Sequence, residues 1–421
     1  MLQCLPGAAE RESQPMSFDY STFFRDDLPP AANAFAGFPA YNFVGGHNDA
    51  GSVPVDALTE ALSRAMARDG QHLATYGMNG GAQGYLPLRN YIAEMLEDRA
   101  GMVTDPGDIL ITTGSLQGLD LVNGALLSPG DTVIVEAVSY AGTLSRLRRG
   151  GVAYEAVKVD EGGMCMTHLS EILAGLKSKG VRPKFIYTIP TVQNPSATVM
   201  SVARRQQMLD LARKYGVPIF EDDCYAELIW EGQRPPTIRS MDDQGQVIYC
   251  GTFSKTVAVA LRVGYVVADW PVLRRLMPLK TDGGCGALEQ MALADYCPEH
   301  YAGHVDELRH VLKGKYDVMT SAMAEQFGAS AEFAPQNAGI FLWVTLPDSV
   351  NTDKLAQIAG AQGVAINPGS DWSADPDTGR HRIRLCFGHA THQQIRDGVA
   401  RLADICHGEF GVPLRGANVE R

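Results

Sequence analysis

The amino-acid sequence predicts an α/β fold, in which helices cover both faces of a mostly parallel sheet and a smaller α+β unit follows. Between residues 108 and 268, short apolar runs of the β type alternate with amphipathic helical patterns. This alternation is typical of parallel sheets. Beyond residue 300 the helical and strand patterns follow one another differently, which indicates a separate unit. Glycine, hydroxyl and acidic residues stand just after several apolar runs, where such sheets bind their ligands.

The expected elements follow the chain in order. Helical patterns occupy 56–68 and 88–99, on either side of a glycine-rich loop at 76–85. In the α/β part, apolar runs predict strands at 108–112, 132–136, 184–189, 217–221, 246–251 and 263–268. Amphipathic patterns predict helices between them at 114–127, 141–149 and 202–215. In the later unit we expect helices at 301–327 and 391–406, and strands at 339–345 and 383–387.

The N-terminal segment, residues 1–54, is irregular and rich in Pro, Gly and Asn, yet it contains aromatic residues such as Phe35, Phe38 and Tyr41. Disordered tails are poor in aromatic residues, so we expect this segment to be an arm that packs on other protein and joins the small domain. A large domain is expected at 55–305, and a small C-terminal α+β domain at 306–421.

Composition excludes several classes of protein. The chain has 421 residues, a net charge of −12 and a pI near 5.3, whereas a nucleic-acid partner usually needs a basic face. No apolar stretch approaches the ~20 residues of a membrane span, and no basic segment with an apolar core marks a secretory signal. The eight cysteines form no Cys-x-x-Cys pair and no zinc-type spacing with histidine. We therefore expect a cytoplasmic protein with no metal site.

The most informative segment runs from Val247 to Arg262, where a β-type run ends in small hydroxyl residues and one lysine, Lys255. This layout places the amine at the mouth of a sheet, with Thr252, Ser254 and Arg262 close enough to bind an anion. A lysine that forms an imine needs this setting, because partial burial and nearby positive charge lower its pKa. The aldehyde that also carries a phosphate is pyridoxal 5′-phosphate (PLP). A solvated lysine in a surface turn is the alternative.

Two further motifs follow earlier strands. The segment from Thr112 to Gly118 reads strand, glycine turn, helix, and the N–H groups that open a helix can hold a phosphate. Such a turn also occurs for packing alone. In the segment 135–140, Tyr140 stands just past a strand, where it could cover a planar ring, although many such tyrosines belong to the core.

Two more motifs offer polar side chains at strand ends. In the segment 188–195, Asn194 precedes a proline and presents an amide, unless it is only a turn former. In the segment 220–225, Asp222 closes an apolar strand and Tyr225 follows three positions later. A carboxylate against a pyridine nitrogen keeps that nitrogen protonated and makes the ring an electron sink. The alternative for Asp222 is an N-cap or turn acid.

With these residues in place, the chain resembles the fold-type I, class I/II PLP aminotransferases of the α-aminoadipate, kynurenine and MocR-type branch, from about residue 42 to 403. The resemblance implies the aspartate aminotransferase fold, with a mostly parallel seven-stranded sheet. It implies that Lys255 carries the Schiff base, that Asp222 binds the pyridine nitrogen and that Asn194 and Tyr225 bind the ring hydroxyl. Tyr140 would stack on the ring. The implied phosphate ligands are the turn at Gly114, the backbone amides of Ser115 and Leu116, and Thr252, Ser254 and Arg262.

The resemblance also implies a substrate site and a partner. Arg384 would bind the α-carboxylate of an amino acid, helped by Asn194 and by Gly46 of the N-terminal loop. Tyr76 matches a tyrosine that reaches the cofactor of the neighbouring subunit, so a homodimer with shared sites is expected.

The chain departs from the family at three places. Residues 194–197 read Asn-Pro-Ser-Ala where the family has Asn-Pro-Thr-Gly, and Val259-Ala260 replaces Pro-Gly. His47 and Asn48 stand where the N-terminal loop of the family reads Gly-x-Pro. These departures are compatible with PLP binding but argue against simple transamination.

Three functions remain open. The lead hypothesis is transamination of an α-amino acid, in which the freed Lys255 removes the α-proton and returns it to the cofactor. In the alternative hypothesis the same activated substrate undergoes β- or γ-elimination, replacement or carbon–carbon bond formation. An example would be a reaction of a sulfonium amino acid in specialised metabolism. The third is a ligand-sensing regulator of the MocR type, which the acidic composition and the short segment before the fold disfavour.

Overall fold

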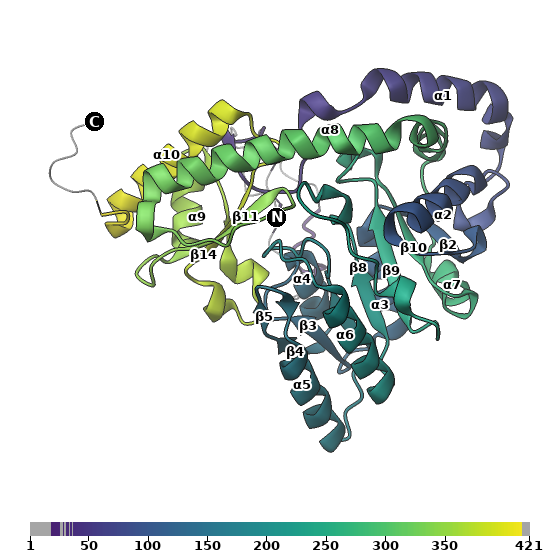
Figure 1. Cartoon of the computed structure of the whole chain (residues 1–421), viewed down its shortest axis with the longest axis horizontal. Coiled ribbons are helices and arrows are strands. Elements are labelled where there is room, and N and C mark those ends of the chain that lie inside the picture. Colours follow the sequence, from purple (N-terminus) through teal and green to yellow (C-terminus); the bar gives the residue numbers. More distant parts are fainter. Residues whose placement is uncertain (1–17, 26–27, 29–30, 33, 36, 415–421) are drawn as a thin grey trace.

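The computed structural model describes residues 18–25, 28, 31–32, 34–35 and 37–414 and confirms the α/β fold. Its centre is a seven-stranded sheet in the order β2-β10-β9-β8-β7-β3-β4 (Figure 1). All neighbours are parallel except β10, which is antiparallel to both β2 and β9. The strands are β2 (Ile109–Thr113), β3 (Thr132–Glu136), β4 (Ala153–Val157), β7 (Ile186–Thr188), β8 (Ile219–Asp222), β9 (Val247–Thr252) and β10 (Val263–Val267).

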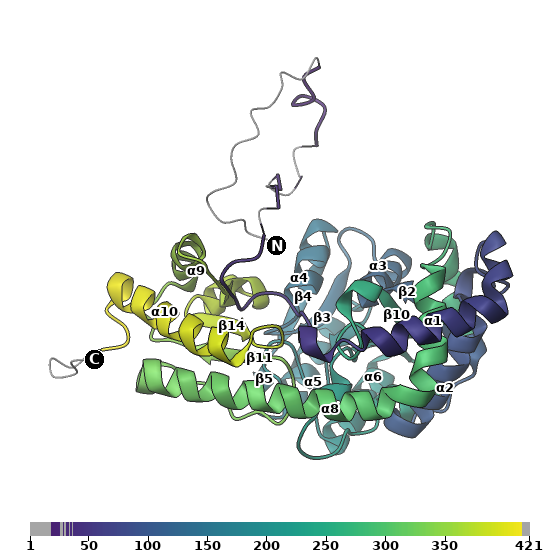
Figure 2. The same cartoon turned by 90° about the horizontal axis from the view of Figure 1, so that it is seen from above.

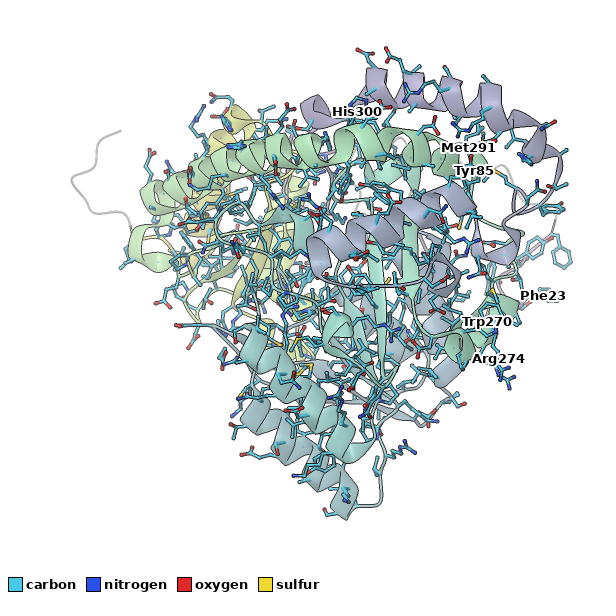
Figure 3. All side chains as sticks on the ribbon, turned by 45° about the vertical axis from the view of Figure 1, so that its right-hand side comes forward. Phe23, Tyr85, Trp270, Arg274, Met291 and His300 are labelled. Carbon is cyan, nitrogen blue, oxygen red and sulfur yellow. The ribbon has the colours of Figure 1, made fainter. Side chains whose placement is uncertain are left out.

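Both faces of the sheet are buried, which explains why its strands read as nearly continuous apolar runs. Alternate residues go to opposite faces: Leu110 packs in one core cluster, and Ile109 and Ile111 pack in another. One face carries α3 (Ser115–Leu126), α4 (Ala141–Arg149) and α7 (Trp270–Leu276). The other carries α1 (Val55–Asp69), α2 (Leu86–Ala100), α5 (Met166–Ser178), α6 (Val202–Tyr215) and part of α8 (Ala287–Phe327). Tyr85 and Met291 belong to this second layer and are labelled beside α8 in Figure 3.

The C-terminal unit has its own sheet and core. Strands β11 (Phe341–Thr345), β14 (Arg382–Cys386) and β13 (Asn367–Pro368) form an antiparallel sheet, which α9 (Thr352–Ala361) and α10 (His392–Phe410) cover. The chain before α1 joins this unit, because β1 (Tyr41–Asn42) pairs with β12 (Val364–Ala365). Phe43 then lies fully buried in the core of the C-terminal unit. Residues 41–43 thus attach the N-terminal segment to the small unit.

Helix α8 connects the two units without a break (Figures 1 and 2). Its 41 residues begin against the large sheet and end against the small one, and Pro298 lies inside it. The sequence predicts only the part from 301 onward, because the proline and the Gly-Gly-Cys-Gly run at 283–286 suggest a break. The boundary expected between residues 305 and 306 therefore falls within a single helix.

Several elements are absent from the sequence-based prediction. They are the short strands β1, β12 and β13, the edge strand β4, the hairpin of β5 (Val159–Asp160) and β6 (Gly163–Met164), and helices α5, α7 and α9. Strand β4 has a mixed, half-exposed sequence because it forms the edge of the sheet. Helix α7 has only seven residues, too few for a clear helical period.

The arm presents its aromatic residues to solvent. Phe18, Tyr20 and Phe23 contact one another, and more than half of each side chain is exposed. Figure 2 shows the described part of the arm projecting from the body, and Figure 3 shows Phe23 at the edge of the molecule. The predictions for residues 1–17, including the missing secretory signal, and for 415–421 concern positions outside those described.

Among the described residues, no helix is long and apolar enough to span a membrane. The same part of the chain contains no group of three or more His, Cys, Asp or Glu side chains arranged to hold a metal ion.

Candidate cofactor and substrate site

A cavity of about 810 Å³ opens where the parallel strands end, between the large sheet and the small unit. It collects most of the residues that the sequence singles out. Those that line it are Gly46, Ser115, Leu116, Tyr140, Asn194, Asp222, Tyr225, Ser254, Lys255, Arg262 and Arg384. Gly114 and Thr252 lie directly behind the wall, and Tyr76 does not line the cavity. Segments up to 339 residues apart in the chain therefore meet at one place.

Lys255 follows β9 and points into the cavity, where its Nζ donates to the carbonyl oxygen of Gly46 at 2.9 Å. A Cβ at Gly46 would lie 2.6 Å from this Nζ, so a larger residue there would require the amine to shift. Burial lowers the pKa of Lys255, and the positive charges of Arg384 and Arg262 lower this pKa further. Within the described residues no carboxylate forms an ion pair with Lys255. The amine is therefore positioned to be neutral and nucleophilic.

The side of the cavity next to β2 has the features of an anion site. Helix α3 begins at Ser115, and the residue before it, Gly114, provides no side-chain cap for its free N–H groups. Gly114 has φ of 71°, and a Cβ there would lie 2.4 Å from Nη2 of Arg262. Arg262 donates to the carbonyls of Val259 and Thr113 and has no carboxylate partner in the described chain. This combination leaves its positive charge free for a phosphate.

Thr252 supports this anion site from behind. Its Oγ1 lies 3.0 Å from both Oγ of Ser254 and the carbonyl oxygen of Val263, and it accepts the N–H of Ser254 at 3.1 Å. Ser254, not Thr252, reaches the cavity wall. The direct contact that the resemblance implies for Thr252 is therefore not supported, and its geometry is that of a residue that orients Ser254.

Asp222 and Asp223 face opposite sides of β8, as the alternation of an extended chain requires. Asp222 lines the cavity and accepts from Tyr187 Oη at 2.6 Å and from Cys224 Sγ at 2.8 Å. Asp223 instead pairs with Arg234 at 2.7 Å and accepts from Tyr249 at 3.0 Å. Burial raises the pKa of Asp222, and the two hydrogen bonds oppose that rise. Only Asp222 can therefore meet a ligand in the cavity.

Asn194, Tyr225 and Tyr140 form the remaining wall. Asn194 Nδ2 donates to Tyr225 Oη at 3.3 Å, whereas its Oδ1 is buried without a partner among the described atoms. Burial raises the pKa of Tyr225, which keeps its hydroxyl as a donor. Tyr140 lines the cavity beside Trp372, at 5.9 Å between ring centroids. The unpaired oxygen of Asn194 indicates that a ligand donor completes this wall.

A buried network that the sequence analysis does not identify holds Asn194 in place. Glu136, at the end of β3, is fully buried and accepts from Thr188 Oγ1 at 2.7 Å and from Gln193 Nε2 at 2.9 Å. Gln193 Oε1 in turn accepts from the Ser196 N–H at 2.8 Å. Burial raises the pKa of Glu136 to about 7. The acidic end of an apolar strand is the signal that could have identified this residue.

Ala197 stands where the resembled family has glycine, and its φ of 58° lies in the left-handed region. The backbone shape that a glycine would favour is therefore retained by an alanine, at a cost of about 1 kcal/mol. The departure at this position does not remodel the wall of the site.

Arg384 is almost fully buried, with 2% of its surface exposed, and lines the cavity from β14. Its guanidinium lies between the rings of Phe341, at 4.6 Å, and Trp372, at 4.1 Å. It donates to Asn367 Oδ1 at 3.1 Å and to the Gly45 carbonyl at 3.4 Å, and its Nε has no partner among the described atoms. A buried guanidinium without a carboxylate is a receptor for one. Arg382, two positions earlier, does not line the cavity.

Two departures from the family meet in one hydrogen bond. Asn48 and Val259 each replace a proline of the resembled motifs, and Asn48 Oδ1 accepts the Val259 N–H at 2.8 Å. Valine introduces a backbone donor that proline lacks, and asparagine supplies its acceptor. Asn48 therefore connects the N-terminal loop to the turn that follows Lys255.

Tyr76 lies outside the cavity with 93% of its surface exposed. Its ring would lie 3.5 Å from a Cβ at Gly283, in the glycine-rich turn before α8. Such an exposed ring on a structured loop is typical of a surface that another molecule covers.

Comparison with known proteins agrees with this geometry. The sequence profile described as "Aminotransferase class I and II" matches residues 42–402. An aromatic-amino-acid aminotransferase 1 of Thermococcus litoralis is 32% identical over 85% of each chain. The crystal structure of a kynurenine aminotransferase of Pyrococcus horikoshii, in complex with PMP, is 33% identical, covers 89% of this chain and 92% of that one, and superposes with a TM-score of 0.82. An uncharacterized HTH-type transcriptional regulator of Bacillus subtilis, YdfD, is 30% identical over 81% of this chain and 69% of its own length.

We predict that Asn48 and Val259 are energetically coupled. Asn48→Ala leaves the Val259 N–H unpaired, and Val259→Pro removes this donor. The free energy of unfolding lost in the double variant should therefore be smaller, by about 1 kcal/mol, than the sum of the losses in the two single variants. Urea unfolding of the four proteins measures this coupling. As a control, Asn351→Ala removes the cap of α9 far from Val259, and its effect should simply add to that of Val259→Pro. Additive effects for Asn48 as well would contradict the coupling.

Proposed function

We propose that this chain, which belongs to the class I and II aminotransferases and uses PLP, transfers the amino group of α-amino acids with aromatic or apolar side chains. The observation that carries the proposal is the buried amine of Lys255, which faces the cavity between a free arginine and a buried carboxylate. The names of two relatives, an aromatic-amino-acid aminotransferase and a kynurenine aminotransferase, support this class of side chain.

The residues that line the cavity fit PLP in three separate places. The uncapped start of α3, Ser254 and Arg262 suit its phosphate, and Asp222 suits its ring nitrogen. The buried unpaired oxygen of Asn194 suits a donor on the bound ligand. When bound there, PLP supplies the aldehyde and the electron-accepting ring on which amino-group transfer depends.

In this proposal Lys255 has two tasks. Its neutral amine would hold the aldehyde carbon of PLP, and the same amine, when free, would be the base that takes the proton from the α-carbon of the substrate. Burial, which lowers the pKa of Lys255, makes it a base rather than a permanent cation. Asp222 would pair with the ring nitrogen of PLP, and Tyr187 orients that carboxylate through its hydrogen bond at 2.6 Å.

Arg384 is proposed to bind the α-carboxylate of the substrate. The two aromatic rings that enclose its guanidinium fix its plane, so it can present two parallel N–H groups to a carboxylate. The outer rim of the cavity carries Arg146 and Arg148, which the sequence analysis does not identify as site residues. Arg146 pairs with Asp120 at 2.6 Å, and Arg148 donates to Tyr154 Oη and the Ser373 carbonyl. Both guanidinium groups are therefore engaged by partners within the protein.

Elimination, replacement and carbon–carbon bond formation have no observation in their favour. That hypothesis came from the departures at 194–197, 259–260 and 47–48. Ala197 keeps the left-handed backbone, and Asn48 compensates for the changed turn at Val259. The departures thus leave the machinery for amino-group transfer in place.

The proposed assembly is a homodimer with shared active sites, because Tyr76 is exposed and the arm displays aromatic residues. We also propose the division of the chain into an arm at 1–54, a large domain at 55–305 and a small domain at 306–421. In this division α8 provides a continuous connection across the second boundary. A cytoplasmic location is proposed from the unpaired thiols of all described cysteines.

We predict that Lys255 is the lysine that joins PLP. Borohydride reduction of the holoenzyme, followed by peptide mapping, should place the pyridoxyl group on Lys255, since its amine faces the cavity. Lys280 is the internal control, because its side chain is 1% exposed and its Nζ pairs with Asp282 at 2.6 Å. A label on Lys280 or on any other lysine would overturn the assignment.

The neighbouring carboxylates should differ sharply in their effect on turnover. Asp222→Asn removes the charge that faces the cavity, so kcat should fall by a factor on the order of 100 or more while PLP stays bound. Asp223→Asn disturbs only the pair with Arg234 and should have a smaller effect on kcat than on thermal stability. A larger loss of kcat in Asp223→Asn than in Asp222→Asn would contradict this assignment.

Arg384→Lys should raise the apparent KM for the amino acid by at least about tenfold, because lysine cannot reproduce a bidentate contact worth roughly 1.5–3 kcal/mol. The absorbance of the bound cofactor should not change. Arg382→Lys is the matched control on the same strand and should leave KM as it is. If Arg382→Lys raises KM and Arg384→Lys does not, the carboxylate site has been assigned to the wrong arginine.

Subunit mixing tests the dimer. A Lys255→Ala subunit and a Tyr76→Ala subunit should each be inactive or nearly so in homodimers, and mixing them should restore part of the activity, because one site in each hybrid dimer combines two intact contributions. A monodisperse monomer that keeps full activity at nanomolar concentration would refute the proposal.

A further inference from the structure

The loop at residues 45–49 contributes Gly45, Gly46 and His47 to the wall of the cavity and contacts two basic side chains there. The carbonyl of Gly45 accepts from Arg384 and the carbonyl of Gly46 accepts from Lys255. The next side chain, His47, also lines the cavity. If Arg384 holds the α-carboxylate and Lys255 reaches the α-carbon, as proposed above, His47 lies where the third substituent of that carbon can extend.

His47 has a built aromatic support. Its ring lies 5.6 Å from that of Phe38 and 5.8 Å from that of His389, and the last two rings are 6.2 Å apart. The imidazole also packs against Gly45, where a Cβ would lie 2.6 Å from its Nε2. Neither ring nitrogen of His47 has a hydrogen-bond partner among the described residues. The ring therefore has a fixed place and unused polar atoms.

The loop itself is held on both sides of His47. Asn48 Oδ1 accepts the N–H of Val259, and the Asn48 carbonyl lies 3.2 Å from Nδ1 of His389. Asp49 pairs with Lys315 of α8 at 2.6 Å. These contacts connect the loop to the turn after Lys255, to the segment after β14 and to α8, so His47 does not depend on a mobile loop for its position.

The charged groups that act on His47 are basic side chains. They are Lys255, in the turn after β9, and His389, in the segment after β14, and each contributes a positive charge when it carries a proton. Asp49, on the same loop, is engaged by Lys315. Burial lowers the pKa of His47, and positive charge on His389 and Lys255 lowers it further. The ring is therefore neutral at pH 7 and above and gains a proton only below its usual range near pH 6.5.

We propose that His47 contacts the side chain of the substrate, that its neutral ring selects aromatic and apolar side chains, and that its protonated ring accepts a second carboxylate. This inference rests on the proposed function and names the residue that sets its side-chain selectivity. A neutral imidazole backed by Phe38 offers an aromatic wall with a weakly hydrated edge. An imidazolium offers a charged donor that pairs with a carboxylate but is costly to bury against an apolar side chain.

The test compares L-phenylalanine with L-glutamate in the first half-reaction of the holoenzyme. The second-order rate constant for loss of the cofactor's visible absorbance is measured from pH 5.5 to 8, so no acceptor is needed. The rate constant for phenylalanine divided by that for glutamate should fall by about tenfold or more as the pH falls and His47 gains its proton. His47→Phe should raise this ratio at low pH and make it independent of pH.

Three further variants make the result specific. His47→Gln keeps a polar side chain without a titration, so it too should lose the pH dependence. His392→Gln removes an exposed histidine at the start of α10 and should behave as the wild type. If His389→Gln abolishes the pH dependence while His47→Gln retains it, the titrating ring is His389 and the proposal is wrong.

A binding measurement separates selectivity from turnover. The affinities of 3-phenylpropanoate and glutarate, which lack an amine, should change with pH in the same direction as the rate constants: as the pH falls, the dissociation constant of 3-phenylpropanoate should rise and that of glutarate should fall. Both changes should be lost in His47→Phe. A reactive wild type whose selectivity is unchanged in His47→Phe would overturn this inference alone. A wild type that reacts with neither amino acid would overturn the proposed function together with it.

Discussion

A short strip of backbone, the carbonyls of Gly45 and Gly46, holds the two basic side chains on which the site depends. One accepts from Arg384 and the other from Lys255. Carbonyl groups stabilise these side chains without supplying a negative charge, so the guanidinium remains free for a carboxylate and the amine can stay neutral. A carboxylate in the same place would form ion pairs with both and block both proposed functions. The position of this strip is therefore the constraint from which the rest of the geometry follows.

The architecture keeps this strip in register with the large sheet. The strip belongs to the segment that pairs with β12 and buries Phe43 in the small unit, while Lys255 belongs to the large sheet. The continuous helix α8 and the hydrogen bond between Asn48 and Val259 connect the two parts. The Asp49–Lys315 ion pair fixes the strip within the small unit. A rearrangement of the small unit would move the carboxylate receptor and the amine relative to each other.

Much of this arrangement could be predicted from sequence, because polar residues at the carboxyl ends of parallel strands must share one edge. That rule alone predicts that Asn194, Asp222 and Lys255 lie close together, and the structure shows it. The rule does not give side-chain direction, so the hydrogen bond from Tyr187 to Asp222 and the place of Thr252 behind Ser254 could not be predicted. Contacts between distant loops, such as Asn48 with Val259, and half-exposed edge elements such as β4 also leave no periodic pattern to read.

The central claim is that the buried amine of Lys255 and its surroundings serve amino-group transfer. Its most direct test is a single turnover of the holoenzyme with excess L-phenylalanine and no 2-oxo acid, in which cofactor absorbance and products are measured together. The account predicts complete conversion of the cofactor to its pyridoxamine form, with one equivalent of phenylpyruvate per active site and no free ammonia. Release of ammonia, or consumption of the amino acid while the cofactor keeps its aldehyde, would contradict it.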